Sequence, residues 1–270
     1  MKILKDNPST GLLDGDAGCG AVAAKSAMRR CIQKAKGTGI AAVGVNNSGN
    51  IIAPAIFALE AAKEGLIGCC SSNIQALMAP VGGTTRTLGT NPIAYAAPSQ
   101  GGIPFLFDMS RSATVAAKIL LAARQGSELE PGLLQDKWDN PTTDPNDLFE
   151  WSTDGTLGSS GGAVLPIGGP KGYGMALVVD MLCGVLTGAS FGMDLQVDRA
   201  KQNKPGHFVW AIDIQQFMEL DEFETRMQRR SDGIKSGDTK DGVGEILIPG
   251  ETGIKLKQES LSRGTLKLSN

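Results

Sequence analysis

Residues 78–112 read MAPVGGTTRTLGTNPIAYAAPSQGGIPFLFDMSRS, and the rest of the chain is interpreted from this stretch. Two turns rich in glycine and threonine, at 82–85 and 88–92, precede an apolar run at 104–107 that predicts a strand. The strand ends at Asp108-Met109-Ser110. Such turns expose backbone N–H groups that suit an anionic ligand, and an acid just past a strand stands where ligands commonly bind. A tight hairpin and a strand end would account for the glycines equally well.

The composition is that of a globular protein with one large domain or two moderate ones. The chain has 270 residues, of which 41% are apolar and 20% charged. Its 36 glycines are nearly twice the usual share of about 7%, which predicts many tight turns. The net charge of −2 and the lack of a long basic run argue against nucleic acid as a partner.

The cysteines indicate a reducing compartment and therefore a cytoplasmic protein. Five cysteines are an odd number and none forms a C-x-x-C pair, so we expect buried thiols rather than disulfides or a zinc site. A single histidine also argues against a metal site. Residues 172–189 are the best membrane candidate, but Asp180 interrupts them, and we expect a buried helix and no membrane span.

The hydrophobic pattern predicts alternating strands and helices. We expect a strand at 40–45, a helix at 53–64 and a strand at 66–70, an order that predicts a parallel pair of strands. A helix at 113–124 follows the central stretch, and the polar residues 127–163 are expected to form a long loop or flap. Further on, the sequence predicts a strand at 207–213, a helix at 220–230 and a short strand at 246–249.

A helix beginning near Gly18-Cys19-Gly20 resembles the dinucleotide fingerprint G-x-G-x-x-A. A Rossmann domain at 11–70 is therefore one alternative. The strand that follows ends in Asn46-Asn47 instead of the acidic residue that such a domain uses. We therefore favour a helix start that packs closely against a neighbouring segment.

Taken in order, the motifs resemble the malate/L-lactate dehydrogenase family that is unrelated to the Rossmann lactate dehydrogenases. The resemblance runs from about residue 11 to 255. The matching motifs are the turn at 14–20, residues 45–50, EGLIG at 64–68, APVGG at 79–83, LGTNPIA at 88–94, FDM at 107–109, NPTTDP at 140–145, LP at 165–166, GGPKGYG at 168–174, GHF at 206–208 and PGE at 249–251.

The resemblance implies a mixed α/β fold with a largely antiparallel cofactor-binding sheet and a homodimer. It also implies a substrate and dimerisation domain at 1–75 and 206–270, and an NAD(P)-binding domain at 76–205. The implied chemistry is reversible hydride transfer between NAD or NADP and a small 2-hydroxy or 2-oxo acid, or reduction of a cyclic imino acid. The implied cofactor-binding residues are Asp108, Met109, Ser110, Lys171, Gly172, Gly250 and Glu251, and the implied substrate residues are Ser48, Thr90 and Asn91.

Reduction of a carbonyl or imine needs a proton as well as a hydride. One family histidine lies in an Asp-Ser-His-Gly motif of an N-terminal segment that we expect this chain to lack, since the resemblance opens at residues 12–15. The second family histidine corresponds to Asn50, which can hydrogen-bond a substrate but cannot donate a proton at neutral pH. The remaining proton donors are Lys171, Tyr173 and His207. For Lys171 a cofactor phosphate is the favoured partner, and for His207 a structural role is favoured over a catalytic one.

Two hypotheses follow. The chain is an NAD(P)-dependent oxidoreductase of this family, or it is a catalytically impaired relative that binds a dinucleotide or only holds a dimer. Absence of the family's N-terminal helices also predicts exposed apolar surface, for example on the helix at 21–36.

Overall fold

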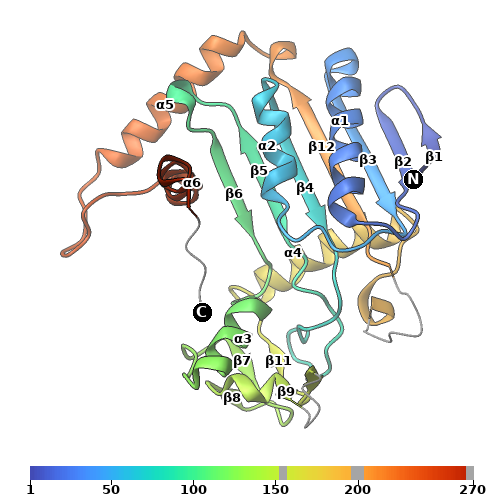
Figure 1. Ribbon diagram of the computed structural model, residues 1–270, viewed down its shortest axis with the longest axis vertical. Coiled ribbons are helices and arrows are strands. Elements are labelled where there is room, and N and C mark those ends of the chain that lie inside the picture. The colour runs from blue at the N-terminus through green and yellow to red at the C-terminus, as the bar shows by residue number, and fades with distance from the viewer. Residues whose placement is uncertain (152–156, 196–203, 266–270) are drawn as a thin grey trace.

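The computed structural model describes residues 1–151, 157–195 and 204–265. Seven strands form one sheet (Figure 1). In sheet order they are β1 (Lys2–Asp6), β2 (Thr10–Asp14), β3 (Ile40–Asn46), β12 (His207–Asp213), β4 (Leu66–Ser72), β5 (Ile93–Ala97) and β6 (Phe105–Met109). Only β2 and β3 pair in parallel. The predicted mixed α/β fold with a largely antiparallel sheet is therefore confirmed.

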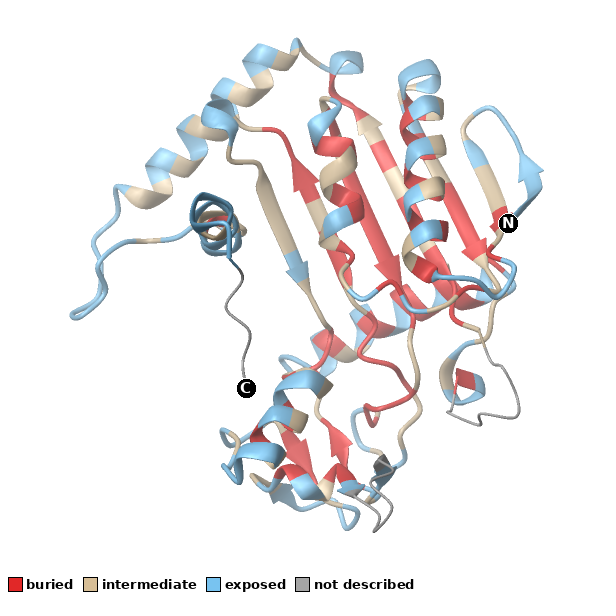
Figure 2. Ribbon diagram, in the orientation of Figure 1, coloured by how far each residue is buried: buried red, intermediate tan, exposed pale blue. Residues whose placement is uncertain are grey.

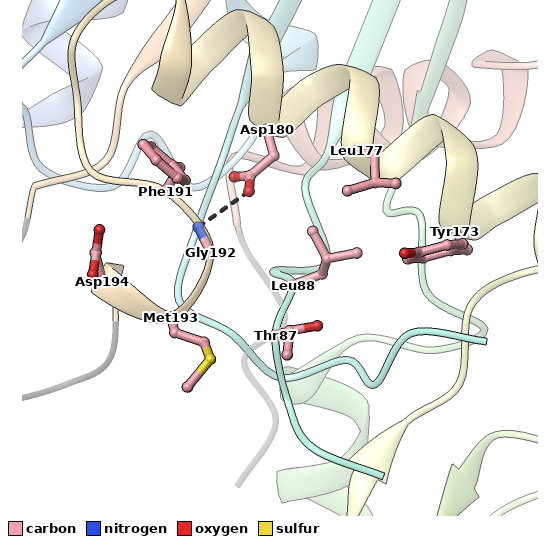
Figure 3. A pocket seen from close by; sticks show the side chains of 9 residues that line it. All are labelled: Thr87, Leu88, Tyr173, Leu177, Asp180, Phe191, Gly192, Met193 and Asp194. Carbon is pink, nitrogen blue, oxygen red and sulfur yellow. Dashed lines mark hydrogen bonds between the residues drawn. The ribbon is translucent and has the colours of Figure 1, made fainter. Parts of the chain in front are cut away.

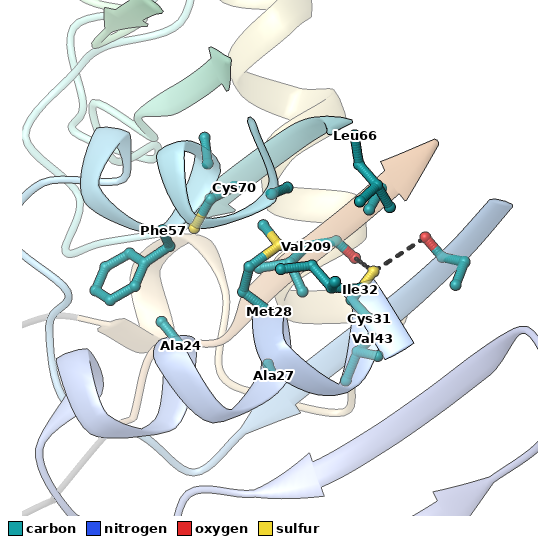
Figure 4. Close-up of a cluster of buried hydrophobic side chains, with 14 of the residues drawn as sticks. Ala24, Ala27, Met28, Cys31, Ile32, Val43, Phe57, Leu66, Cys70 and Val209 are labelled. Atoms are coloured by element: carbon teal, nitrogen blue, oxygen red, sulfur yellow. Dashed lines mark hydrogen bonds between the residues drawn. The ribbon is translucent and has the colours of Figure 1, made fainter. Parts of the chain in front are cut away.

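Two helices, α1 (Gly20–Thr38) and α2 (Ala55–Lys63), cover one face of this sheet (Figure 1). The buried positions of α1 recur every three or four residues, which is the spacing of a helix that presents one side to a core. Its residues Ala27, Met28 and Cys31 lie among Val43, Val209 and other strand side chains (Figure 4). This cluster is the main hydrophobic core.

The opposite face of the sheet is only partly covered, by α4 (Pro170–Asp180) and the π-helical turn Met181–Val185. Val179 and Cys183 pack on Cys69 and Ile93. The prediction that 172–189 is a buried helix is wrong for its outer side, where Val185 and Leu186 are 58% and 62% exposed. Figure 2 shows buried and exposed residues alternating along this helix.

The exposed apolar surface predicted for 21–36 is largely absent there, because α1 turns its apolar side to the core. Val22 is exposed. The exposed apolar residues of α4 and the turn after it form a longer row, which we call the α4 face: Met175, Leu177, Val178, Met181, Val185 and Leu186.

The predicted loop at 127–163 is instead part of a small β unit. It contains β7 (Leu134–Gln135), β8 (Pro141–Thr142), β9 (Phe149–Trp151), β10 (Leu157–Ser159) and β11 (Ala163–Val164), with α3 (Ala116–Gln125) packed on it. Each strand has only two or three residues, too few to show an alternating pattern. The unit nevertheless has its own core, which includes Ile119, Leu134 and Leu148.

The pairing predicted for strands 40–45 and 66–70 is wrong, because β12 lies between β3 and β4 and is antiparallel to both. The parallel pair is β2 with β3, joined by α1. This sheet also overturns the Rossmann alternative. Gly20 is required for close packing, since a Cβ there would collide with the backbone carbonyl oxygens of Gly49 and Asn50.

Two helices, α5 (Leu220–Lys235) and α6 (Glu251–Arg263), end the described chain. Residues 246–249 form no strand. Instead the Leu106 N–H donates to the Pro249 carbonyl at 3.2 Å, which holds the start of α6 against β6. Within the described ranges, no helix is long and apolar enough to cross a membrane. The two-domain division stays a prediction.

Candidate active site

Several motifs found in the sequence converge at one end of the main sheet. Strands β2, β3, β4 and β6 end there, while β12 and β5 begin there. The register makes this plain, since His207 pairs with both Val45 and Ser72, and Ile93 pairs with both Ser71 and Met109. The connections that carry Ser48, Asn50, Thr90 and Ser110 therefore leave the same end of the sheet.

The turn after β3 is fixed by the turn after β2. The Gly15 and Ala17 N–H groups donate to the carbonyls of Asn46 and Asn47, and the Gly49 N–H donates to Gly18, each at 2.9 Å. Asn47 has a positive φ of 47°, which asparagine tolerates better than most residues.

Within this turn the two predicted site residues differ in exposure. Ser48 is fully buried and its hydroxyl has no hydrogen-bond partner among the described residues. Asn50 is exposed at the start of the connection to α2. Of the two residues, only Asn50 is open to solvent. The Ser48 hydroxyl is buried under the turn and has no hydrogen-bond partner among the described residues.

His207 is fully buried at the start of β12. Its Nδ1 lies 2.9 Å from the Ser72 hydroxyl, and its Nε2 has no partner among the described residues. Burial lowers the pKa of His207 to about 4, so the imidazole is neutral at pH 7. These features favour the structural role over proton donation.

Thr90 and Asn91 lie at the centre of a buried polar network. The Asn91 amide donates to the Ala176 carbonyl of α4 at 2.9 Å, and its oxygen accepts from the Ile74 N–H at 3.3 Å. The Thr90 carbonyl accepts from the Arg111 N–H at 2.7 Å. The two residues thereby tie α4 and the end of β6 to the turn before β5.

Asn73 and Asp180 extend this network. The Asn73 amide donates to Asp180 at 3.1 Å and to the Ser190 carbonyl at 2.8 Å, while its oxygen accepts from the Gly206 N–H at 2.8 Å. Burial raises the pKa of Asp180, and the hydrogen bonds from Asn73 and from the Gly192 N–H act in the opposite direction.

Asp180 also lines an open pocket of about 370 Å³ beside α4 (Figure 3). Tyr173 and Leu177 of α4 form one wall, and Thr87 and Leu88 face them. The pocket is mostly apolar, with the Asp180 carboxyl at one end next to Gly192. Its position against Leu88 places it beside the turn that carries Thr90 and Asn91.

The predicted cofactor residues Asp108, Met109 and Ser110 lie at the end of β6. Asp108 is inside the strand, not just past it, and one oxygen accepts from the Ala55 N–H at 3.1 Å. Although Asp108 is exposed, the protein around it removes enough water to raise the pKa of its carboxyl, while this hydrogen bond and the Arg111 charge oppose the rise.

Lys171 and Gly172 lie in the first turn of α4, with Lys171 exposed and Gly172 packed on Ile167. Next to them is a second pocket, of about 490 Å³, lined by the turns Gly82-Gly83 and Gly168-Gly169. An added Cβ on Gly82, Gly168 or Gly169 would meet nothing within 4 Å, so these turns border open space. Open glycine backbone beside a helix N-terminus and a lysine fits the phosphates of a dinucleotide.

Gly250 and Glu251 lie farther up β6, where Gly250 packs on Leu106. The Glu251 carboxylate pairs with Lys235 at 2.6 Å and accepts from the Ile248 N–H at 3.1 Å. Both interactions hold α6 to its surroundings. The structure thus gives Glu251 protein partners, whereas Lys171 is exposed two residues after Gly169, which lines the second pocket.

Sequence reasoning missed three residues of this region: Asn73, Asp180 and Arg111. Asp180 carried a signal, as the one acidic residue in an apolar segment. Asn73 follows a buried strand, and Arg111 follows Asp108-Met109-Ser110, so their positions at strand ends were readable. Their burial was not, because each is enclosed by segments distant in sequence.

Known proteins share this fold and these motifs. Malate dehydrogenase from Pyrococcus abyssi is 38% identical over 264 residues, which cover 98% of this chain and 72% of that protein. Ureidoglycolate dehydrogenase (NAD(+)) from Escherichia coli K12 is 34% identical over 71% of this chain and 51% of its own length. The solved sulfolactate dehydrogenase from Methanocaldococcus jannaschii superposes with a TM-score of 0.87 at 33% identity, covering all of this chain and 74% of that one.

The fold and the motifs define an oxidoreductase of the non-Rossmann type. The family model described as malate/L-lactate dehydrogenase matches residues 1–269, and the chain belongs to that family. The resemblance inferred from the sequence and the enzyme class that it implied are thereby confirmed. The relatives named here are dehydrogenases, so the catalytically impaired alternative gains no support from them.

Proposed function

We propose that this chain is an NAD(P)-dependent oxidoreductase that interconverts a small 2-hydroxy acid and its 2-oxo acid, of the malate, lactate or sulfolactate type, or reduces a cyclic imino acid. The observation that carries the proposal is the match to the family over residues 1–269, combined with the convergence of Asn50, Thr90, Asp108 and Ser110 at one end of the sheet.

In this proposal, the cofactor binds beside α4 and the end of β6. A bound nicotinamide dinucleotide would supply the hydride. Lys171 and the open turns at Gly82-Gly83 and Gly168-Gly169 would hold its phosphates, and Asp108, Met109 and Ser110 would border it. Glu251 is assigned here to holding α6, because Lys235 already neutralises its charge. NAD and NADP are both compatible with this arrangement.

Lys171 is assigned here to the cofactor phosphates, and proton donation is its alternative role. It is exposed beside a pocket, whereas His207 is buried and neutral at pH 7. Tyr173 lines the neighbouring pocket with Asp180. Asn50 would orient the substrate by hydrogen bonding, together with Thr90. Asn91, whose amide and oxygen already bond Ala176 and Ile74, would hold Thr90 in place, and Ser48 would support the turn that carries Asn50.

The test is a fluorescence titration of the protein with NADH and with NADPH. We expect saturable binding that weakens at least tenfold in Asp108→Asn and Lys171→Ala, while Lys118→Ala on the exposed side of α3 binds as the original chain does. Asparagine keeps the acceptor for the Ala55 N–H, so the first variant removes charge only. No binding of either nucleotide by the folded protein would contradict the proposal.

Turnover with a panel of substrates then names the reaction. The panel contains oxaloacetate, pyruvate, sulfopyruvate and Δ1-pyrroline-2-carboxylate, each with NADH and NADPH. Oxidation of the reduced nucleotide with one of them identifies the substrate class. Tight nucleotide binding without any turnover would leave only the impaired alternative.

The proposal includes a cytoplasmic homodimer. All five cysteines are free and four are buried, and burial raises the pKa of Cys31, Cys69 and Cys183 to about 12, as suits thiols kept in a reducing compartment. The α4 face is the apolar surface that we assign to the contact between two copies.

A further inference from the structure

Arg111 is an enclosed cation that has no counter-charge among the residues that the structure describes. Its side chain is 4% exposed, and its Nε has no hydrogen-bond partner. In the part of the chain that the structure describes, its guanidinium makes no ion pair and no hydrogen bond. Burial lowers the pKa of Arg111, but an arginine remains protonated at neutral pH. Buried charges are normally paired, so this one requires an explanation.

The surroundings of Arg111 do not supply the missing anion. Its charge acts on Tyr95, Cys69 and Asp108. Burial raises the pKa of both Tyr95 and Cys69, so these two are neutral at pH 7. One oxygen of the Asp108 carboxylate accepts from the Ala55 N–H, and among the described residues Asp108 forms no ion pair with Arg111.

Arg86 shows what a partly buried arginine does in this chain when its role is structural. Its guanidinium donates to the carbonyl oxygens of Gly162 and Leu148, which fastens the segment before β5 to the small β unit. The guanidinium of Arg111 has no such acceptors within residues 1–151, 157–195 and 204–265. Its backbone, by contrast, is fixed on both sides, since its N–H donates to Thr90 at 2.7 Å and its carbonyl accepts from the Ile167 N–H at 3.0 Å. The backbone of Arg111 is therefore held in place, while its guanidinium has no protein partner in the described part of the chain.

We propose that Arg111 binds the carboxylate of the substrate. This inference rests on the proposed function, since it assigns the acid group common to 2-oxo acids and cyclic imino acids. The planar guanidinium matches a carboxylate with two parallel hydrogen bonds. Arg111 adjoins Thr90, one of the residues assigned to the substrate, and its narrow exposure suits a small acid group better than the phosphates of a dinucleotide.

The test uses oxalate as a small dicarboxylate probe, added with and without saturating NADH. Calorimetry gives its dissociation constant, and thermal unfolding gives the shift in midpoint. In Arg111→Met we expect the oxalate dissociation constant to rise at least tenfold and the midpoint shift to disappear. Arg111→Lys should retain part of the affinity, since an ammonium keeps the charge but not the paired hydrogen bonds. The matched control is Arg229→Met, on the exposed side of α5.

A second readout separates a ligand-binding role from a structural one. Removing an unpaired buried charge should leave the unfolding midpoint of Arg111→Met without oxalate equal to or above that of the original chain. A midpoint lowered by several degrees in both Arg111→Met and Arg111→Lys would overturn the inference, because it would show that the guanidinium is needed for folding.

The remaining outcomes are equally decisive. An unchanged oxalate affinity in Arg111→Met, or no oxalate binding by the original chain, overturns the assignment even where 2-oxo acids are turned over. If Arg111→Met loses affinity for NADH but keeps its affinity for oxalate, the assignment is also wrong. Arg111 would then be assigned to the nucleotide phosphates. The protein could also bind oxalate through Arg111 and yet turn over none of the substrates. That result would support the inference about Arg111 and contradict the proposed reaction.

Discussion

His207 couples the stability of the sheet to pH. Its pKa is about 4 in the folded protein and about 6.5 in an unfolded chain, so the unfolded state binds a proton first as the pH falls. Neutral His207 makes its full contribution to the unfolding free energy above pH 6.5. This contribution declines as the pH falls from 6.5 to about 4. The shift corresponds to about 3 kcal/mol of unfolding free energy over that range.

We therefore expect His207→Gln to lose less stability than the original chain between pH 7 and pH 4. Urea unfolding at several pH values in this range measures the difference, which should approach 3 kcal/mol. Glutamine can still bond the Ser72 hydroxyl, so the comparison reports the titration rather than the lost contact. Parallel curves for the two proteins would show that His207 is not the titrating group.

Single residues were only partly predictable from the sequence. The turns that carry Asn50, Thr90 and Lys171 were recognisable because glycine, asparagine and threonine at fixed spacing form turns whatever lies around them. The enclosed state of Ser48, Asn73 and Arg111 depends on segments that can lie more than a hundred residues away, such as Gly206 against Asn73. No local pattern records such contacts.

At the scale of elements, the junction between the start of α1 and the turn after β3 depends on Gly20. A methyl group there would meet the carbonyl oxygens of Gly49 and Asn50, and backbone groups cannot yield as a flexible side chain does. We expect Gly20→Ala to lower the unfolding free energy by roughly 3 kcal/mol. Chemical denaturation followed by circular dichroism measures this.

The matched control lies in the same helix. A Cβ on Gly37 meets nothing within 4 Å, and alanine favours a helix over glycine by up to about 1 kcal/mol, so Gly37→Ala should be neutral or stabilising. A small effect of Gly20→Ala, similar to that of Gly37→Ala, would mean that the two turns are not in close contact.

Several long elements were predicted from the sequence and the shortest strands were not, but the thirteen-residue helix α6 and the five-residue strands β1 and β5 were missed as well. Helix α1 and strands β3, β4 and β12 are long enough for the spacing of their apolar residues to be recognised. The two- and three-residue strands of the small β unit do not. The order of the sheet was missed for a different reason: a β-α-β sequence gives the direction of its strands but cannot say that β12, more than a hundred residues later, lies between them.

At the scale of the whole molecule, the α4 face predicts self-association. Val185 and Leu186 are more than half exposed on it, and a row of apolar side chains gains free energy when a second copy covers it. We expect a dimer by size-exclusion chromatography with light scattering, and a monomer for Leu186→Glu. The control is Phe217→Glu, an exposed apolar residue (75%) in the connection between β12 and α5. A monodisperse monomer of the original chain would contradict the assignment.

The central place of β12 also governs how the chain can be made. The ribosome delivers β1 to β6 first, yet β3 and β4 have no partner between them until residue 213 has emerged. Until then each of the two strands presents one unpaired edge, and both pairings that β12 makes span more than 130 residues. High contact order of this kind slows folding and leaves nascent chains open to aggregation. Synthesis therefore passes through a long interval in which β3 and β4 each expose an edge, and a ribosome stalled before residue 207 would hold a chain that cannot complete its sheet.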